Sequence, residues 1–300
     1  MLNEKRRPYE YMVYPTLQTA WIRGKGLLLF LGLYFVEFGA GIFLAAILFH
    51  NLWGQTAGWL ISGALGGACH FLFLGHPFRI YRAFRKPGKS WISRGLFLIS
   101  FFQIIAFVHL LLSYLSTPVT WVTVVAGIAA MATILYGGYE IADVKSIQTW
   151  NSSFFPIQML ARSFFLGLAI VLTLNLLSGF EMADAQTEQW LIGTFLINIC
   201  LFALNLFSLS FEGGKEKLSL SMMMKGKLKW IFWPWVITGG MVVPLIVSVY
   251  ALLKGTDETS TLMLLITVIL QVICDFLLRY GFMRSGYYSG LFPARPADFR

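Results

Sequence analysis

The chain has 300 residues, of which 57% are hydrophobic and 12% are charged, and its formal net charge is +9. In a soluble chain this positive charge would suggest nucleic acid as a partner. A chain this apolar is typical of a membrane protein instead. In such a protein, Lys and Arg set the topology and bind anionic lipid headgroups. We therefore expect a lipid bilayer around the chain and no nucleic acid as a partner.

Eight apolar stretches follow one another along the chain. In order they cover residues 27–50, 56–76, 94–115, 119–141, 158–179, 190–211, 230–253 and 261–283. Each has the length of about 20 residues that an α-helix needs to cross ~30 Å of hydrocarbon. None carries the polar stripe of a helix in a soluble core. The sequence predicts an all-α, polytopic membrane protein with eight transmembrane helices.

The basic residues lie in alternate loops. The N-terminal segment, the loops after the second, fourth and sixth stretches, and the C-terminal segment hold 20 of the 23 Lys and Arg residues. The opposite loops hold Lys254 and the acids Glu181, Asp184, Glu188, Asp257 and Glu258. Because basic loops stay in the cytoplasm, we expect an inner-membrane protein with both termini cytoplasmic. No cleavable signal peptide is expected before the first stretch.

The loop lengths predict how the helices group. The very short loops at 51–55 and 116–118 indicate tight antiparallel pairs, whereas the joint at 142–157 is longer. We expect two four-helix bundles, residues 1–143 and residues 144–300.

Ionisable residues within the stretches are the candidates for function, because each costs several kcal/mol in hydrocarbon unless it is paired or hydrated. They are Glu37, His70, His109, Arg162, Asp275 and Arg279. Asp275 and Arg279 are four residues apart and share a helix face, which predicts a structural ion pair. Glu37 has no partner in its own helix. It is therefore either a neutral acid or part of a proton route.

No residue pattern indicates a metal or haem site in this chain. Cys69, Cys200 and Cys274 are far apart and fall within apolar stretches, which is typical of buried thiols. A haem held by two histidines needs both at one depth. By 1.5 Å per residue, His70 lies about 9 Å and His109 above ~20 Å from the basic face. We expect no haem and no metal.

Three segments resemble the membrane anchors of the NrfD/DmsC type, which belong to polysulfide reductase, DMSO reductase and related iron–sulfur molybdoenzymes. The first is Leu74-Gly75-His76-Pro77-Phe78-Arg79 with Ser90-Trp91-Ile92-Ser93-Arg94, similar to the family's link between its second and third helices. The second is Ser146-Ile147-Gln148-Thr149-Trp150-Asn151-Ser152 with Pro156, and the third is Asp275-x-x-x-Arg279-Tyr280.

This resemblance implies a membrane subunit that has no catalytic residues of its own. Such anchors bind a quinone, either menaquinone or ubiquinone. They exchange electrons with a docked ferredoxin-like iron–sulfur subunit, and through it with a molybdopterin catalytic subunit.

Quinone chemistry moves protons together with electrons, so titratable groups must meet the ring oxygens. At the basic ends of the first four stretches we expect the quinone-binding residues His76, His70, Arg79, Tyr136, Tyr139 and Trp91. Glu37, Asp143 and Glu140 would form the proton route. A simpler interpretation of His76 is that it caps its helix, where an imidazolium meets the negative end of the helix dipole.

The chain departs from the family at positions that hold the quinone in its relatives. Leu29 and Gly32 stand where polysulfide-reductase-type members carry an Asn and a His, and Phe73 stands near where DMSO-reductase-type anchors carry a His. His70, His76 and Glu37 are the possible substitutes.

Two other classes remain as alternatives. One is a proton-coupled secondary transporter, since eight helices with buried charges also suit such a carrier. Against it, no predicted helix is interrupted at mid-depth by a Gly/Pro pair at corresponding positions in the two halves of the chain, as carriers often are. An enzyme that acts on lipids would need a His/Asp-rich metal cluster, which the sequence lacks.

Overall fold

In the part of the chain that the structure describes, eight helices are long and apolar enough to cross a membrane. The computed structural model describes residues 15–177, 185–211, 215–254 and 261–290. Helices form here because backbone polar groups in hydrocarbon must pair within their own segment. Five spans are single helices: α2 (Lys25–Leu48), α5 (Trp91–Tyr114), α6 (Thr120–Ala142), α7 (Phe154–Leu177) and α8 (Ala185–Phe211). A sixth, α12 (Thr261–Arg284), is the last span. The prediction of an all-helical protein with eight spans is confirmed.

The second and seventh spans each contain a π-helical stretch. The second runs through α3 (Leu52–Leu60), the π-helix η1 (Ile61–Gly66) and α4 (Gly67–Phe73). The seventh runs through α10 (Lys229–Ile231), the π-helix η3 (Phe232–Val242) and α11 (Val243–Lys254). Stretches of π-helix are rare and recur near functional sites. The sequence analysis did not predict either of them.

Polar caps set where two spans begin. The side chain of Asn51 accepts a hydrogen bond from the backbone N–H of Gly54 at 2.6 Å, and α3 starts at Leu52. Ser90 accepts from the backbone N–H of Ser93 at 3.4 Å, and α5 starts at Trp91. Both helices therefore start three or four residues before the apolar stretches, because a cap rather than hydropathy fixes a helix start.

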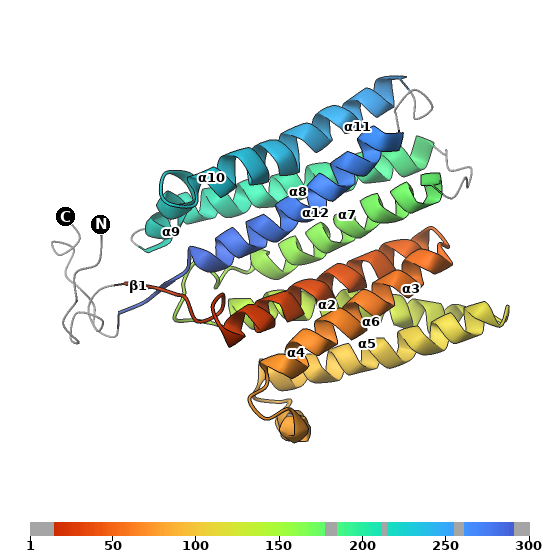
Figure 1. The fold of residues 1–300 in the computed structure, drawn as a ribbon, viewed down its shortest axis with the longest axis horizontal. Coiled ribbons are helices and arrows are strands. Elements are labelled where there is room, and N and C mark those ends of the chain that lie inside the picture. Colours follow the sequence, from red (N-terminus) through yellow and green to blue (C-terminus); the bar gives the residue numbers. More distant parts are fainter. Residues whose placement is uncertain (1–14, 178–184, 212–214, 255–260, 291–300) are drawn as a thin grey trace.

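Helices α2 and α7 lie side by side in the middle of the molecule, with α3 to α6 on one side and α8 to α12 on the other (Figure 1). Buried residues of α2 and α7, among them Ile42, Ala46, Leu168 and Val171, share one apolar core. The predicted boundary between residues 143 and 144 falls between these groups. The core continues across that boundary, and the division into two bundles stays a prediction.

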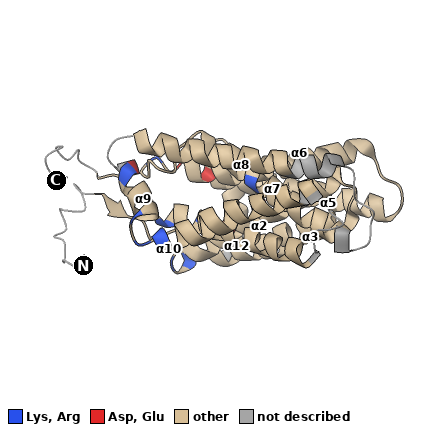
Figure 2. Ribbon diagram, turned by 90° about the horizontal axis from the view of Figure 1, so that it is seen from above, with Lys and Arg blue, Asp and Glu red and all other residues tan. Residues whose placement is uncertain are grey.

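The basic residues gather at the end of the molecule that carries α9 and α10 (Figure 2). This end is here called the basic end. Its helix α9 spans Lys215–Met224, and it also carries the 3-10 helix η2 (Pro77–Arg85). A two-stranded antiparallel ribbon joins the terminal segments there, as β1 (Thr16–Leu17) pairs with β2 (Tyr287–Tyr288). Of the opposite loops, the acids Glu181, Asp184, Asp257 and Glu258 lie outside the described residues.

The loop between α6 and α7 is folded inward at the basic end. Trp150 is fully buried. Its ring meets that of Trp21 edge-on with centroids 5.4 Å apart, and its Nε1 donates to the Phe282 carbonyl at 3.4 Å. The Ser289 amide donates to the Ser146 carbonyl at 2.8 Å. The loop between α6 and α7 therefore connects the N-terminal segment to the end of α12.

Candidate functional site

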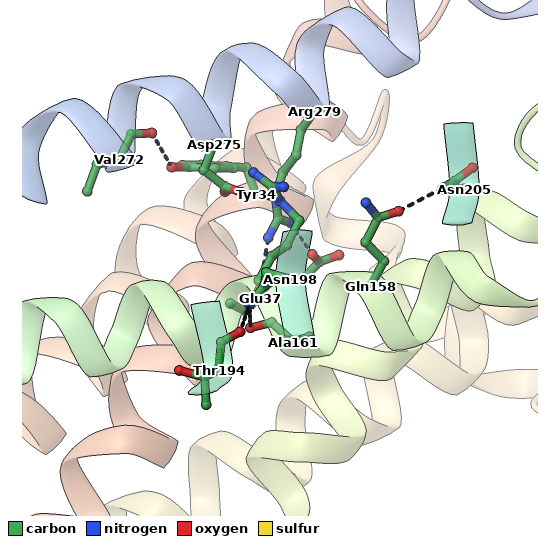
Figure 3. Close-up of polar contacts among 12 residues, drawn as sticks. Tyr34, Glu37, Gln158, Ala161, Thr194, Asn198, Asn205, Val272, Asp275 and Arg279 are labelled. Atoms are coloured by element: carbon green, nitrogen blue, oxygen red, sulfur yellow. Dashed lines mark hydrogen bonds and ion pairs between the residues drawn. The ribbon is translucent and has the colours of Figure 1, made fainter. Parts of the chain in front are cut away.

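A network of four charged side chains joins three spans in the membrane interior. Figure 3 labels three of them, Glu37, Asp275 and Arg279. Arg279 of α12 contacts Glu37 of α2 through Nη1 and donates from Nε to Asp275 Oδ2 at 3.0 Å. Arg162 of α7 donates from Nε to the other Asp275 oxygen at 2.7 Å. The side chains of Glu37, Asp275 and Arg279 are at most 7% exposed. Two acids and two arginines balance, so the network carries no net formal charge.

Sequence analysis predicted only part of this ion network. The structure places Asp275 and Arg279 in contact, as their spacing suggests. It also gives Glu37 a counter-ion, Arg279, which lies 242 residues further along the chain. The signal available in the sequence was that two acids and two arginines lie within apolar stretches. It gave no means of deciding which of them meet.

Small residues let α2 and α7 come close enough for this contact. A Cβ atom added at Gly41 would collide with the Ser163 backbone, and one at Gly167 would collide with the Gly41 carbonyl. Glycine at such positions allows the backbones of two helices to approach. Ser163 then accepts a hydrogen bond from Arg279 Nη2 at 2.9 Å.

Two more polar side chains lie between the ion network and the basic end. The Tyr136 hydroxyl donates to Glu140 Oε2 at 2.6 Å, and both side chains are buried in α6. Glu37 packs against Gly137 so closely that a Cβ at Gly137 would collide with its carboxylate. Since Glu140 is near the end of α6 and Glu37 is near the middle of α2, these residues form a buried polar series running inward from the basic end.

An aromatic pair lies beside this series. Trp91 at the start of α5 stacks on Tyr139 of α6 with centroids 5.3 Å apart and planes 7° apart. The guanidinium of Arg94 lies 4.6 Å from the Trp91 ring centre, within the range of a cation–π contact. The Tyr139 side chain is 47% exposed, so this pair forms part of the outer surface near the basic end.

His70 of α4 presents one ring nitrogen without a partner. Its Nδ1 lies 2.9 Å from the Gly66 carbonyl, a contact in which only Nδ1 can be the donor. The buried Nε2 atom is then an acceptor, and within the described ranges no group pairs with it. The ring lies over Gly32 of α2, where an added Cβ would meet it.

The other predicted residues lie apart from this buried group. His76, Arg79 and Asp143 are exposed at the basic end, His76 just before η2 and Asp143 just after α6. The structure thus separates the predicted site into the buried series, the aromatic pair, His70 and these exposed residues. His109 uses both ring nitrogens, with Nε2 2.8 Å from Gln55 Oε1 and Nδ1 3.1 Å from the Thr123 hydroxyl. Over the part of the chain that the structure describes, no group of three His, Cys, Asp or Glu could hold a metal ion.

A small cavity adjoins the Glu37 end of the ion network. Its polar wall is formed by Tyr34, Glu37 and Arg279, and its apolar wall includes Phe30 and Phe155. The volume of the cavity is about 20 Å³. Since one buried water needs roughly 10–15 Å³, the cavity has room for a single water.

Eight spans around a buried, neutral ion network define a multi-pass membrane protein. The family model of the polysulphide reductase NrfD matches residues 25–289. The chain therefore belongs to the NrfD family, the membrane subunits of polysulphide reductase-type complexes, and the resemblance drawn from its sequence is confirmed. None of the curated proteins matches the chain.

Proposed function

We propose that the chain exchanges electrons between a membrane quinone and an iron–sulfur subunit docked at the basic end. The observation that carries this proposal is the buried series Glu140, Tyr136 and Glu37. Packing alone does not require two carboxylic acids on one path through a membrane interior, where each is costly. A redox reaction that takes up and releases protons does require such groups.

His70 is the side chain best suited to meet the ring oxygen of a quinone. A bound quinone supplies the two-electron, two-proton chemistry. The free Nε2 of His70 would accept a hydrogen bond from a quinol hydroxyl, while the bond from Nδ1 to Gly66 holds the imidazole in place. Gly32 stands where polysulfide-reductase-type relatives carry a quinone-contacting His, and the ring of His70 fills the space that Gly32 leaves.

The remaining predicted residues have supporting roles in this proposal. Trp91 and Tyr139 would form an aromatic wall for the ring, and His76 with Arg79 would lie at the entrance on the basic end. Tyr136, Glu140 and Glu37 would carry protons inward, and Asp143 would connect the series to water.

The basic end is the proposed docking surface for the partner. Membership of the NrfD family implies a reductase complex. We infer that a ferredoxin-like iron–sulfur subunit binds the loops 77–94 and 212–229, whose Lys and Arg residues suit an acidic surface, and that a molybdopterin subunit binds behind it. The positive-inside rule supports an inner-membrane protein with this end and both termini in the cytoplasm.

The test of the site is quinol oxidation by membranes that carry His70→Ala, His76→Ala or Tyr139→Phe. We expect the largest loss for His70→Ala and a smaller one for Tyr139→Phe. His50→Asn is the matched control, because His50 is exposed at the opposite end of the bundle. If all three variants assemble and oxidise quinol at the parent rate, the quinone binds elsewhere. Purification of the chain from its native membrane alone and without iron would contradict the docking proposal.

A further inference from the structure

A second cavity adjoins the ion network at the Arg162 end. It lies between α7, α8, η3 and α12. Arg162 and Asp275 form its charged wall, and Asn198, Gln271 and Cys274 also line it. The four charged side chains from Glu37 to Arg162 therefore have one cavity beside Glu37 and another beside Arg162.

Two amides that line this cavity, those of Asn198 and Gln271, each have an oxygen without a hydrogen-bond donor among the described residues. Asn198 donates from Nδ2 to the carbonyls of Ala161 at 3.0 Å and Thr194 at 2.9 Å, which fixes the amide with Oδ1 as the free acceptor (Figure 3). Over the described ranges, neither Asn198 Oδ1 nor Gln271 Oε1 has a partner, although the two residues are only 5% and 7% exposed. An acceptor buried in hydrocarbon without a donor costs several kcal/mol. Two such oxygens at one cavity indicate a ligand that donates hydrogen bonds.

The size of the cavity suits water as that ligand. The volume of the cavity is about 30 Å³. Since a buried water needs roughly 10–15 Å³, about two waters fit. A buried water typically makes about three hydrogen bonds. Asn198 and Gln271 offer acceptors here, and Arg162 offers N–H donors.

We propose that this cavity is a water-binding site that extends the polar path from the ion network into the second group of helices. The waters donate to Asn198 Oδ1 and Gln271 Oε1 and accept from Arg162. They hydrate the Arg162–Asp275 pair on the side away from Glu37.

The thiol of Cys274 reports whether water enters the cavity. The chain has three cysteines, so Cys69→Ser and Cys200→Ser leave Cys274 as the single thiol. The infrared S–H stretch lies apart from other protein bands and moves when deuterium replaces hydrogen. We expect the Cys274 S–H to exchange within minutes when the purified protein is placed in D2O, although Cys274 is only 2% exposed.

Removing the amides should make the cavity dry. Gln271→Leu and Asn198→Leu, made separately in this background, should each slow exchange at least about tenfold, because exchange then needs local opening of the helices. Thr267→Val is the matched control. Thr267 lies one turn from Gln271 on α12, and its hydroxyl already donates to the Met263 carbonyl at 2.7 Å. It should leave the exchange rate unchanged. Elution as a single peak in size-exclusion chromatography checks that each variant is assembled.

Two results would overturn the water site. One is a Cys274 thiol that stays protonated in D2O while the same protein exchanges at once in denaturing detergent. The other is exchange at the parent rate in both leucine variants. The measurement uses no quinol. A dry cavity therefore contradicts the water site alone, whereas unchanged quinol oxidation in the His70, His76 and Tyr139 variants contradicts the proposed quinone site alone.

Discussion

Arg279 of α12 contacts Glu37 of α2 and Asp275 of its own helix at the same time. One guanidinium thus binds two carboxylates from two spans, because its N–H groups point in different directions. Ser163 of α7 accepts a further hydrogen bond from it at 2.9 Å, which brings in a third span. Arg279 is therefore the centre of the ion network, and its removal should affect all three helices.

We predict that Arg279→Gln destabilises the protein far more than the loss of a surface charge. It leaves Glu37 without its counter-ion, and breaking a buried ion pair on one side costs about 3–5 kcal/mol. The measurement is thermal unfolding in mild detergent. Lys217→Gln, an exposed change on α9, is the control and should leave the midpoint unchanged. Equal midpoints for the two variants would show that the ion network does not hold the helices together.

A pair of glycines on α6 offers a sharper comparison. A Cβ at Gly137 would collide with the carboxylate of Glu37, whereas at Gly127 the nearest side-chain atom is 3.8 Å away. We predict that Gly137→Ala displaces Glu37 and lowers both stability and quinol oxidation. Gly127→Ala should be neutral or slightly stabilising, since alanine favours a helix by about 1 kcal/mol. The midpoint of unfolding and the turnover rate are measured for both variants. A Gly137→Ala protein as stable and active as Gly127→Ala would mean that α2 and α6 are not in this close contact.

Tyr136→Phe separates the proton route from packing. The ring keeps its place against Gly95 of α5, and only the hydrogen bond to Glu140 at 2.6 Å is lost. A hydrogen bond to a charged group contributes about 1.5–3 kcal/mol, so we expect a modest loss of stability. Quinol oxidation should fall more than in Tyr114→Phe, the control, whose hydroxyl lies 3.0 Å from Thr56 and outside the series. Parent turnover in Tyr136→Phe would exclude this hydroxyl from the proton route.

The buried loop at the basic end predicts a change in protease sensitivity. Trp150→Ala removes a fully buried ring that packs on Trp21 and donates to Phe282. Such a deletion costs about 3–5 kcal/mol. We expect limited proteolysis to cut the chain near the ribbon of β1 and β2 much faster than in the parent. Trp230→Ala is the control. The Trp230 side chain is 73% exposed, so its removal should leave the cleavage pattern unchanged.

The orientation is tested with a cysteine at an exposed site of the basic end. Lys89→Cys, in a chain without its own cysteines, should resist an impermeant thiol reagent in intact cells and react after the membrane is opened. This follows from the cytoplasmic placement of basic loops. Ready labelling in intact cells would place the basic end, and the docked partner, outside.

The sequence predicted the spans well because the signal for a transmembrane helix is its length and hydropathy, and both are local. Over the described residues, the ends of all eight spans lie within about five residues of the predicted stretches. The starts of α3 and α5 differ because Asn51 and Ser90, which are polar, cap them. The π-helical stretches η1 and η3 were missed, since their side chains are as apolar as those of the neighbouring turns.

The site was harder to predict because it depends on contacts between distant segments. The spacing of Asp275 and Arg279 indicates a shared helix face, which is local information. The contact of Glu37 with Arg279 depends on how α2 and α12 pack around α7, and no spacing within one helix encodes that. The same holds for His70, whose position over Gly32 depends on the approach of α4 to α2. Trp150 is flanked by polar residues in the sequence, so its local surroundings do not predict that it is fully buried.

The pairing of Glu37 with Arg279 also has a consequence for biosynthesis. Glu37 enters the bilayer with the first span, and its counter-ion is made 242 residues later. At about 5–20 residues per second, the first span waits roughly 10–50 s for the arginine. During that interval an acid lies in the membrane without its partner, so the insertion machinery or the neighbouring spans must shelter it. Chains cut short before α12 should accordingly be recognised as unfinished and degraded, even though their first seven spans have been made.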